Sequence, residues 1–373
     1  MEIAEVNTRI KLKKFIDFPY SLHRNTKNWI PPLKLEQKKI FDPSKNSILQ
    51  HSDYQLFLLY KEGRIVGRIA AHINHHYNQY WGEKTGFFGH YECVEDQGAA
   101  DHILGAAENW LREHGMDLMR GQWNFVSQDF GFVVEGFDVP PAVLSSYNPP
   151  YYNDQMLSFG MRKAKDLLVY SCDANKGYRI PERFLRLTDA IVARYGVRVR
   201  ILNMRDLVGD ARIIVKLSND SLAGNWGVYP IEESEAEQIA RDLKSIIHPE
   251  AVLIAEVEDQ AIGYLIGIPD VNSILKKMKG RLFPLGIFRL LAGGKKLRRY
   301  RIWAMGLVPE YQKKGISVLL FRKLNDALAP KGAYVEANYV LEDNHLMNNA
   351  LRQLKFDLVK KYRVYEKPIE QLQ

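Results

Sequence analysis

The chain has 373 residues, of which 46% are hydrophobic and 26% are charged, and its formal net charge is +8. These values are typical of a folded chain of two ordinary domains and exclude a low-complexity protein. No run of about 18 apolar residues is present, so we expect no segment to cross a bilayer. The opening residues, MEIAEVNTRIKLKKF, lack a long apolar stretch, and we expect no signal peptide. Cys93 and Cys172 lack CxxC spacing, which indicates a reduced compartment without a disulfide or zinc framework.

The first distinctive stretch is HINHH, with His72, His75 and His76 on a strand-like run. It has no acidic third ligand nearby, so we expect no metal site there. The segment 89–115, GHYECVEDQGAADHILGAAENWLREHG, has a strand–turn–helix pattern. An interruption, WNFVSQDFGFVVEGFDVPPAV (123–143), separates it from the block NPPYYNDQMLSFGMRKAKDLLVYSCD (148–173).

One segment concentrates the positive charge of the chain. Between residues 271 and 309 there is no Asp or Glu, and ten cations lie within that span. They exceed the net charge of +8, so the rest of the chain is slightly acidic. The same segment holds the apolar run LFPLGIFRLLAGG, and this combination favours an anionic surface such as lipid headgroups, phosphates or nucleic acid. The cations are Lys276, Lys277, Lys279, Arg281, Arg289, Lys295, Lys296, Arg298, Arg299 and Arg301.

A cationic turn follows this segment. YRIWAMGLV (300–308) is short, apolar and rich in β formers, which predicts a buried strand. The apolar residues after position 315 recur at helical spacing and predict an amphipathic helix that Gly332 ends. The first amides of such a helix have no intrahelical partner, and the helix dipole adds to their attraction for an anion. Gly315 lets the backbone bend, while Lys313 and Lys314 add positive charge.

Three more elements complete the chain. AYVEANYV (333–340) predicts a strand, and LEDNHLMNNALRQL (341–354) predicts a helix that Asp343 or Asn344 can cap. FDLVKKYRVYEKP (356–368) predicts a final strand.

With these elements in this order, the region from about 251 to 368 resembles the GNAT family of acyl-CoA N-acyltransferases. VPEYQKKGIS corresponds to the family's pyrophosphate motif and EDNHLMNNALRQLKF to the block that follows it. The resemblance implies acetyl-CoA or a longer acyl-CoA as co-substrate and no metal. The turn amides would hold the pyrophosphate, the preceding strand would lie along the pantetheine, and Asn344 would bond the pantetheine arm. The residues so assigned are Met305, Leu307, Val308, Gln312, Lys313, Lys314, Gly315, Ile316, Ser317 and Asn344.

The sequence departs from the family pattern at three positions. Ser317 stands where Gly or Ala is usual, which is a mild change because Ser is small. Leu351 stands where many relatives place a Tyr that protonates the leaving thiolate, and this puts the acid step in doubt. Lys355 replaces the usual Gly before Phe356.

The N-terminal half repeats the C-terminal pattern. At an offset of 217 residues, Gly89 meets Gly306, Gly98 meets Gly315 and Gly115 meets Gly332. We therefore predict an α/β fold of two tandem GNAT-like domains, each a twisted, mixed, mainly antiparallel sheet flanked by helices. The expected domains are a degenerate one over 1–175 and an acyltransferase domain over 176–373, with a basic insertion at 271–299. Glu95 and Asp96 replace Gln312 and Lys313 in the first copy, and their charge would repel a pyrophosphate, so we expect no CoA there.

Acyl transfer to an amine requires a neutral amine, a polarised carbonyl and a stabilised thiolate. Glu336, and less so Glu342, are the candidate bases, although a solvated or capping role is the simpler interpretation. For the acid, Tyr339, Tyr362 and Tyr365 lie in the right region, although packing is the simpler role of each. The candidate catalytic set is therefore Glu336, Tyr339 and Tyr362.

The predicted function is acyl-CoA-dependent N-acyl transfer, in the first place N-acetyl transfer, by direct attack of a small-molecule or lipid amine. One alternative is long-chain N-acylation of a sphingoid-type amine at a membrane, contacted through 271–299. Another is a non-catalytic module on the same fold that binds membranes or nucleic acid, although missing interleaved aromatics disfavour nucleic acid. We expect a cytoplasmic location, with the inner face of the membrane as the peripheral alternative. The residues that would suit an acyl chain are Leu282, Phe283, Leu285, Ile287, Phe288, Leu290 and Leu291.

Overall fold

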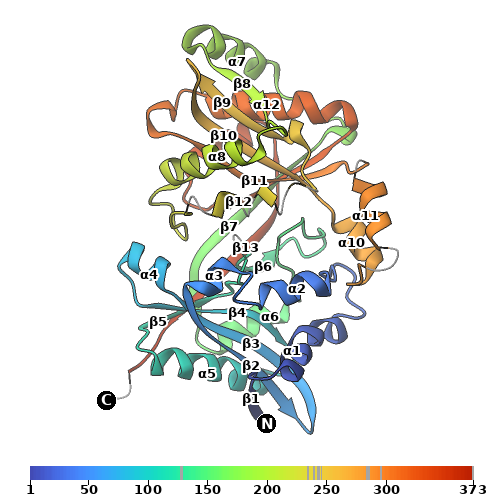
Figure 1. Cartoon of the computed structure of the whole chain (residues 1–373), viewed down its shortest axis with the longest axis vertical. Coiled ribbons are helices and arrows are strands. Elements are labelled where there is room, and N and C mark those ends of the chain that lie inside the picture. The colour runs from blue at the N-terminus through green and yellow to red at the C-terminus, as the bar shows by residue number, and fades with distance from the viewer. Residues whose placement is uncertain are drawn as a thin grey trace. The chain divides into compact units, whose positions relative to one another are not determined.

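The computed structural model describes residues 1–126, 129–232, 235–237, 240–241, 244, 246–282, 286–294 and 296–371. Two compact units divide the chain (Figure 1). Unit 1 comprises Met1–Leu167, Asn272–Ile287 and Lys360–Gln373, and unit 2 comprises Leu168–Val271 and Phe288–Val359. Each unit contains segments from both halves of the sequence. The predicted division at residue 175 concerns the sequence repeat, and it stays a prediction.

The first half of the chain supplies most of unit 1. In that unit the strands are hydrogen-bonded in the order β1-β2-β3-β4-β5-β13, and β6 also pairs with β13. The β4–β5 pair is parallel and the other described pairs are antiparallel. The elements of this half are β1 (Glu2–Glu5), α1 (Arg9–Leu22), α2 (Lys34–Ile40), α3 (Ser47–Gln50), β2 (Ser52–Lys61), β3 (Arg64–Asn74), α4 (His75–Trp81), β4 (Thr85–Cys93), α5 (Gln97–Glu113), β5 (Leu118–Gly121), β6 (Phe132–Glu135), α6 (Tyr151–Ser158) and β7 (Arg162–Asp173).

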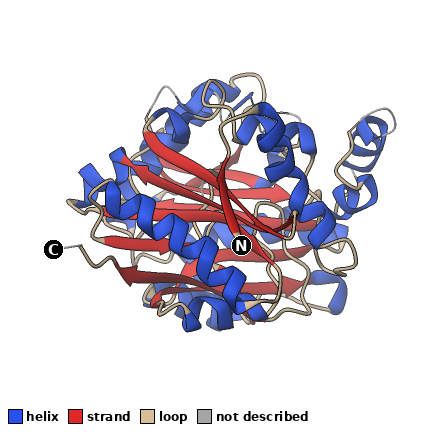
Figure 2. Ribbon diagram, turned by 90° about the horizontal axis from the view of Figure 1, so that it is seen from below, coloured by secondary structure: helices blue, strands red, loops and turns tan. Residues whose placement is uncertain are grey.

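The second half supplies most of unit 2, whose strands follow the order β7-β12-β11-β10-β9-β8. The β11–β12 pair is parallel, and β8, β9, β10 and β11 pair antiparallel in sequence. The elements of this half are α7 (Glu182–Tyr195), β8 (Arg198–Ile201), α8 (Leu207–Leu222), β9 (Val252–Val257), β10 (Gln260–Pro269), α10 (Asn272–Met278), α11 (Gly286–Gly294), β11 (Arg299–Leu307), α12 (Ile316–Leu328), β12 (Tyr334–Leu341), α13 (His345–Gln353) and β13 (Asp357–Pro368). Figure 2 shows these strands flanked by helices.

The two halves repeat one topology. The series β1, α1, β2, β3, β4, α5, β5, α6, β7 has its counterpart in β8, α8, β9, β10, β11, α12, β12, α13, β13, and the pairings match. Even the two-residue hairpin turns correspond, because Glu62 and Gly63 share positive φ angles with Glu258 and Asp259. Such turns need that left-handed backbone to match the twist of their strands. The predicted repeat is therefore present in the fold.

The ungapped alignment of the halves is wrong in one strand. The register pairs Gly67 with Cys93 in one half and Gly263 with Leu307 in the other, so Cys93 corresponds to Leu307. The helix that follows still aligns Gly98 with Gly315. The second turn is therefore three residues longer and includes a short 3₁₀ turn (Pro309–Tyr311).

The last strand of each half carries residues into both units. β7 runs from unit 1 into unit 2, and β13 runs from unit 2 into unit 1 (Figure 1). The hydroxyl of Tyr170 on β7 donates to Oδ1 of Asn348 on α13, at 3.0 Å. The hydroxyl of Tyr365 on β13 donates to Oδ1 of Asn153 on α6, at 2.9 Å. The same bond thus fastens each exchanged strand to a helix of the opposite half.

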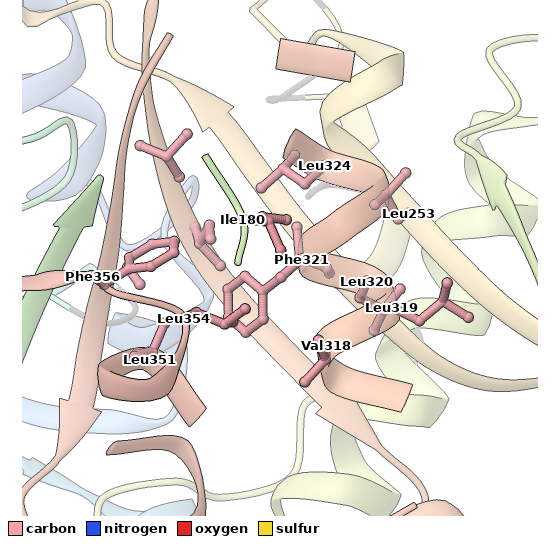
Figure 3. Packing of buried hydrophobic residues seen from close by; sticks show 14 of the residues in the cluster. Ile180, Leu253, Val318, Leu319, Leu320, Phe321, Leu324, Leu351, Leu354 and Phe356 are labelled. Carbon is pink, nitrogen blue, oxygen red and sulfur yellow. The ribbon is translucent and has the colours of Figure 1, made fainter. Parts of the chain in front are cut away.

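Each unit has its own apolar core. In unit 2 the buried side of α12 packs against the sheet and the end of α13 through Phe321, Leu324, Leu351 and Phe356 (Figure 3). In unit 1 the buried side of α5 packs on the sheet in the same way. Each fully buried large side chain of this kind contributes about 1.5–3 kcal/mol. Two separate cores allow the units to differ in function while sharing a topology.

We predict that Tyr170→Phe and Tyr365→Phe each destabilise the chain, because each removes the donor from an amide oxygen, that of buried Asn348 or that of half-buried Asn153. The loss should be about 1–3 kcal/mol, which lowers the thermal midpoint by a few degrees. Thermal unfolding followed by circular dichroism measures this. Tyr80→Phe, at a side chain that is 41% exposed, is the control and should leave the midpoint unchanged. Unchanged midpoints in both variants would mean that the two bonds do not hold the exchanged strands.

Candidate functional site

Strands β11 and β12 of unit 2 are hydrogen-bonded to each other over only part of their length. Their parallel pairing runs from Arg299 opposite Tyr334 to Ile302 opposite Ala337, whereas β11 continues to Leu307 and β12 to Leu341. At the point of departure β11 also holds a bulge, because Ile266 faces Ala304 while Gly267 faces Ile302. Trp303 is the extra residue. Bulges of this kind bend a strand and are frequent beside active sites.

The turn after β11 has the geometry that the sequence predicts. Gly315 is the N-cap of α12, with φ +80° and no side-chain cap bond, and Lys313 also has a positive φ. The side chain of Gln312 closes the turn by donating to the carbonyl oxygen of Leu307 at 3.0 Å. A Cβ at position 315 would lie 2.7 Å from Cδ1 of Ile191 on α7. The backbone angle therefore favours glycine, and any side chain at this position would also displace the end of Ile191.

The mouth of α12 is cationic. The ammonium of Lys314 lies 4.6 Å from the ring centroid of Tyr311 and 5.3 Å from that of Tyr195. These rings hold the charge beside the first turn of the helix. Gln312 and Lys313 are exposed, Ser317 is half-buried and Ile316 is buried in the core. Ile316 can therefore offer only its backbone amide to a ligand.

The backbone amides of the strand residues assigned to the pantetheine point to two opposite sides of β11. The amide of Val308 donates to the carbonyl of Ile262 at 3.0 Å, on the β10 side. Successive amides of a strand point to opposite sides, so the amide of Leu307 points away from β10, where β11 has left β12. Met305 is half-buried against the core. By the same alternation the amide of Met305 also points away from β10, so the amides of Met305 and Leu307 both face the side that β12 has left.

Asn344 begins α13 as one of the two predicted caps. Its Oδ1 accepts a hydrogen bond from the amide of Met347 at 3.1 Å. The oxygen is used by the helix, so the side-chain NH2 is what Asn344 offers to a ligand. Its predicted bond to the pantetheine arm stays a prediction.

Glu336 lies in a buried charged cluster on β11 and β12, and only 1% of its surface is exposed. Asn338 donates to Oε1 of Glu336 at 3.2 Å, and Nη2 of Arg299 lies 3.7 Å from Oε2. Arg299 also lies 3.4 Å from Asp270. Burial and the charge of Glu336 raise the pKa of the neighbouring Tyr334 to about 12. The carboxylate is compensated on both oxygens, as a buried charge requires.

Two of the three candidate catalytic residues lie on the same strand of unit 2. Glu336 and Tyr339 share β12 in unit 2, and the Arg301 guanidinium lies 5.1 Å from the Tyr339 ring centroid. Tyr362 belongs to unit 1, where it is fully buried and donates to the carbonyl of Ser146 at 3.2 Å. That bond favours a packing role for Tyr362. The roles of all three residues in catalysis stay predictions.

The corresponding turn of unit 1 is occupied by its own side chains. Asp96 is the N-cap of α5, accepting from the amide of Ala99 at 3.1 Å and pairing with Lys61 at 2.8 Å. On β4 the amide of His90 donates to Asn124 at 2.6 Å, and the amide of Cys93 donates to the Tyr152 hydroxyl at 3.0 Å. Asn124 comes from the interruption at 123–143. These contacts support the prediction that the first copy binds no CoA, and capping adds to the repulsion expected from Asp96.

The three histidines of HINHH have separate partners. His72 is buried on β3, and burial lowers its pKa to about 3. His75 and His76 begin α4, so only the start of the stretch is a strand. His75 lies 3.0 Å from Asp53, so the expectation that no acidic residue lies near this stretch is wrong. His76 stacks on His51.

The basic segment forms α10 and α11 between β10 and β11. In unit 1, Asn272 donates to the carbonyl of Pro141 at 2.9 Å and Lys276 to that of Lys27 at 2.6 Å. Thus α10 is packed on the protein rather than held free in solvent. On α11, Phe288 is 68% exposed. Phe283, Leu285 and Lys295 lie outside the described residues, as do the side chains of Ile287, Arg289 and Leu291.

Within the described ranges, we find no helix with the length and apolar character needed to cross a bilayer.

We predict that the chain binds one equivalent of CoA, at the Gly315 turn. Gly315→Ala should weaken this binding by about tenfold or more, because alanine is strained at positive φ and would displace Ile191. Gly98→Ala is the matched control in unit 1, where the nearest atom to the added Cβ is 3.3 Å away, and it should leave affinity unchanged. Isothermal titration measures both quantities. Two equivalents per chain, or equal losses in the two variants, would contradict the assignment.

Comparison with known proteins places this geometry in a family. No family model matches the chain. The protein YghO of Escherichia coli strain K12 is 32% identical over 368 residues, covering 96% of this chain and 93% of YghO. The bacterial ceramide synthase of Caulobacter vibrioides is 32% identical over 378 residues, covering 99% of this chain and 98% of that protein.

Solved structures share the architecture at low identity. A tandem GNAT protein from the clavulanic acid biosynthesis pathway superposes with a TM-score of 0.59 at 12% identity, covering 100% of this chain and 99% of its own. A GCN5-related N-acetyltransferase from Sphaerobacter thermophilus gives a TM-score of 0.51 at 13% identity over 84% of this chain and 81% of its own. These matches confirm the predicted tandem GNAT fold. The chain belongs to the family that includes YghO and the bacterial ceramide synthase, and it has the GNAT acyltransferase fold in two copies.

Proposed function

We propose that the chain is an acyl-CoA-dependent N-acyltransferase whose acceptor is a long-chain amine of the sphingoid type. The main observation in favour of this reaction is that β11 separates from β12 ahead of α12, a helix whose N-cap is a glycine and which has no side-chain cap bond. The choice of acceptor rests on the end-to-end match to a protein named as a bacterial ceramide synthase.

The mouth of α12 is suited to the pyrophosphate of acyl-CoA. The amide of Val318 is used within the turn, since it donates to the carbonyl of Gly315 at 2.9 Å. The amides of Ile316 and Ser317 precede it and face the ligand, with a helix dipole equivalent to about half a positive charge behind them. Lys313 and Lys314 supply two full charges beside those amides.

The transfer step needs a donor for the carbonyl and a base for the amine. The amine nitrogen attacks the thioester carbon, a C–N bond forms, the C–S bond breaks and the thiolate accepts a proton. The amide of Leu307 would polarise the carbonyl oxygen. Glu336, next to the point where the strands part, is the candidate to take the ammonium proton, and Tyr339 is the candidate to protonate the thiolate.

N-acetyl transfer to a small amine would use the same turn and strands, so acyl length is decided by experiment. Release of thiol should be measured with acetyl-CoA and palmitoyl-CoA over a panel of amines that includes sphinganine. We expect palmitoyl-CoA with sphinganine to be the preferred pair. Preference for acetyl-CoA with short amines would retain the reaction and overturn the long-chain assignment. No release with any pair would favour a non-catalytic module.

Glu336→Gln should lower kcat for the preferred pair by about 100-fold or more if the carboxylate is the base. The dissociation constant for CoA should not change. Glu182→Gln serves as the control, because the Glu182 side chain on α7 is 79% exposed and is not a candidate base. A fall in CoA affinity parallel to the fall in kcat would instead indicate that Glu336 has a structural role.

Membrane contact is a second proposed property, favoured by the exposure of Phe288 on α11 within the basic segment. Phe288→Ser should reduce co-flotation with phosphatidylglycerol vesicles by about tenfold, because it removes an apolar side chain that would insert into the membrane. Leu157→Ser, at a side chain that is 53% exposed on α6, should have no effect. High salt should weaken the binding of the unaltered chain. Binding that is absent, or indifferent to salt and to Phe288, would eliminate this surface as the anchor.

A further inference from the structure

The buried hydroxyl groups of Tyr264 and Ser221 lie next to Gly306 in unit 2. Tyr264 on β10 pairs with Gly306 on β11, and only 1% of Tyr264 is exposed. A Cβ at position 306 would lie 2.0 Å from Oγ of Ser221, near the end of α8, and 2.7 Å from Cε1 of Tyr264. Both side chains therefore contact β11 at Gly306, in the part of the strand that is no longer paired with β12.

Neither hydroxyl has a hydrogen-bond partner within the described part of the chain. Among the described residues, the Tyr264 hydroxyl and Oγ of Ser221 are both buried without a hydrogen bond. Burial raises the pKa of Tyr264, and the nearby hydroxyls of Ser218 and Ser221 act in the opposite direction. Within the described residues, neither serine reaches hydrogen-bond geometry with the Tyr264 hydroxyl. Buried hydroxyls without partners are rare because their desolvation is not compensated.

The same place in unit 1 is filled by a cluster of charged side chains that bond to one another. By the register of the two hairpins, Arg68 corresponds to Tyr264 and Glu92 to Gly306. Counted from the N-caps of α1 and α8, Thr8 and Asp206, His23 corresponds to Ser221. There Nε2 of His23 lies 2.6 Å from Glu92, and Nη2 of Arg68 lies 3.7 Å from it. Arg68 also donates to the carbonyl of Phe15 at 2.8 Å. The second copy has Gly306 in place of the carboxylate and keeps two hydroxyls that lack a partner among the described residues.

We infer that Tyr264 and Ser221 are the hydroxyl pair that positions the polar head of the acceptor, an amine with an adjacent hydroxyl, against β11. This inference rests on the proposed function and names the acceptor side of the same site. Each hydroxyl can accept from an amine and donate to a hydroxyl, which suits a 2-amino alcohol head. Gly306 leaves the strand free of a side chain at the point where these hydroxyls meet it.

The test compares Tyr264→Phe and Ser221→Ala with a matched control, Tyr178→Phe. The Tyr178 hydroxyl is in the same unit and donates to the carbonyl of Leu354 at 2.9 Å. We expect each test variant to raise KM for sphinganine by about tenfold, with an unchanged KM for palmitoyl-CoA. Tyr264→Phe should not lower the thermal midpoint, whereas Tyr178→Phe should lower it and leave both KM values unchanged.

The outcomes separate the inference from the function beneath it. Turnover with an unchanged KM for sphinganine in both test variants overturns the hydroxyl pair and leaves the proposed function standing. A thermal midpoint lowered by Tyr264→Phe, again with an unchanged KM, identifies a structural bond and has the same consequence. No turnover by the unaltered chain with any amine overturns the proposed function, and the inference falls with it.

Discussion

The parting of β11 from β12 is the constraint on which the proposed site depends. A strand inside a sheet normally satisfies its amides on both sides, and a buried amide without a partner is costly. Beyond Ile302, β11 keeps its bonds to β10 but leaves β12. β11 ends at Leu307, and the turn after it leads to the N-cap of α12 at Gly315. An extended ligand with an anionic end would satisfy the strand and the helix mouth together.

The repeat shows what happens to the same fold when its own side chains fill these places. In unit 1, Asp96 caps the helix, Asn124 and Tyr152 take strand amides, and Glu92 occupies the position of Gly306. In unit 2 the corresponding helix has a glycine cap, and Tyr264 and Ser221 lack bonds within the described part of the chain. The contrast lies in a small number of side chains, because topology and pairing are common to both.

Much of unit 2 follows from local sequence signals. The period of apolar residues after Gly315 predicts α12, Gly332 ends the helical region with a left-handed backbone, and Asn344 caps α13. The exchange of β7 and β13 could not be predicted, because strand partners far apart in sequence leave no local pattern. The placement of Tyr362 in unit 1 follows from that exchange. The packing of α10 on the 27–34 segment was missed for the same reason, since its charge pattern alone is also that of a solvated helix.

The equivalent bonds of Tyr170 and Tyr365 have a consequence for dividing the chain into fragments. Because each half completes its sheet with the last strand of the other, neither half carries every strand that its compact unit contains. Cutting the gene at the middle would therefore yield two fragments that each expose an unfinished sheet edge. Such edges pair with other chains. Two fragments produced together would be expected to reassemble, whereas either one alone would tend to aggregate.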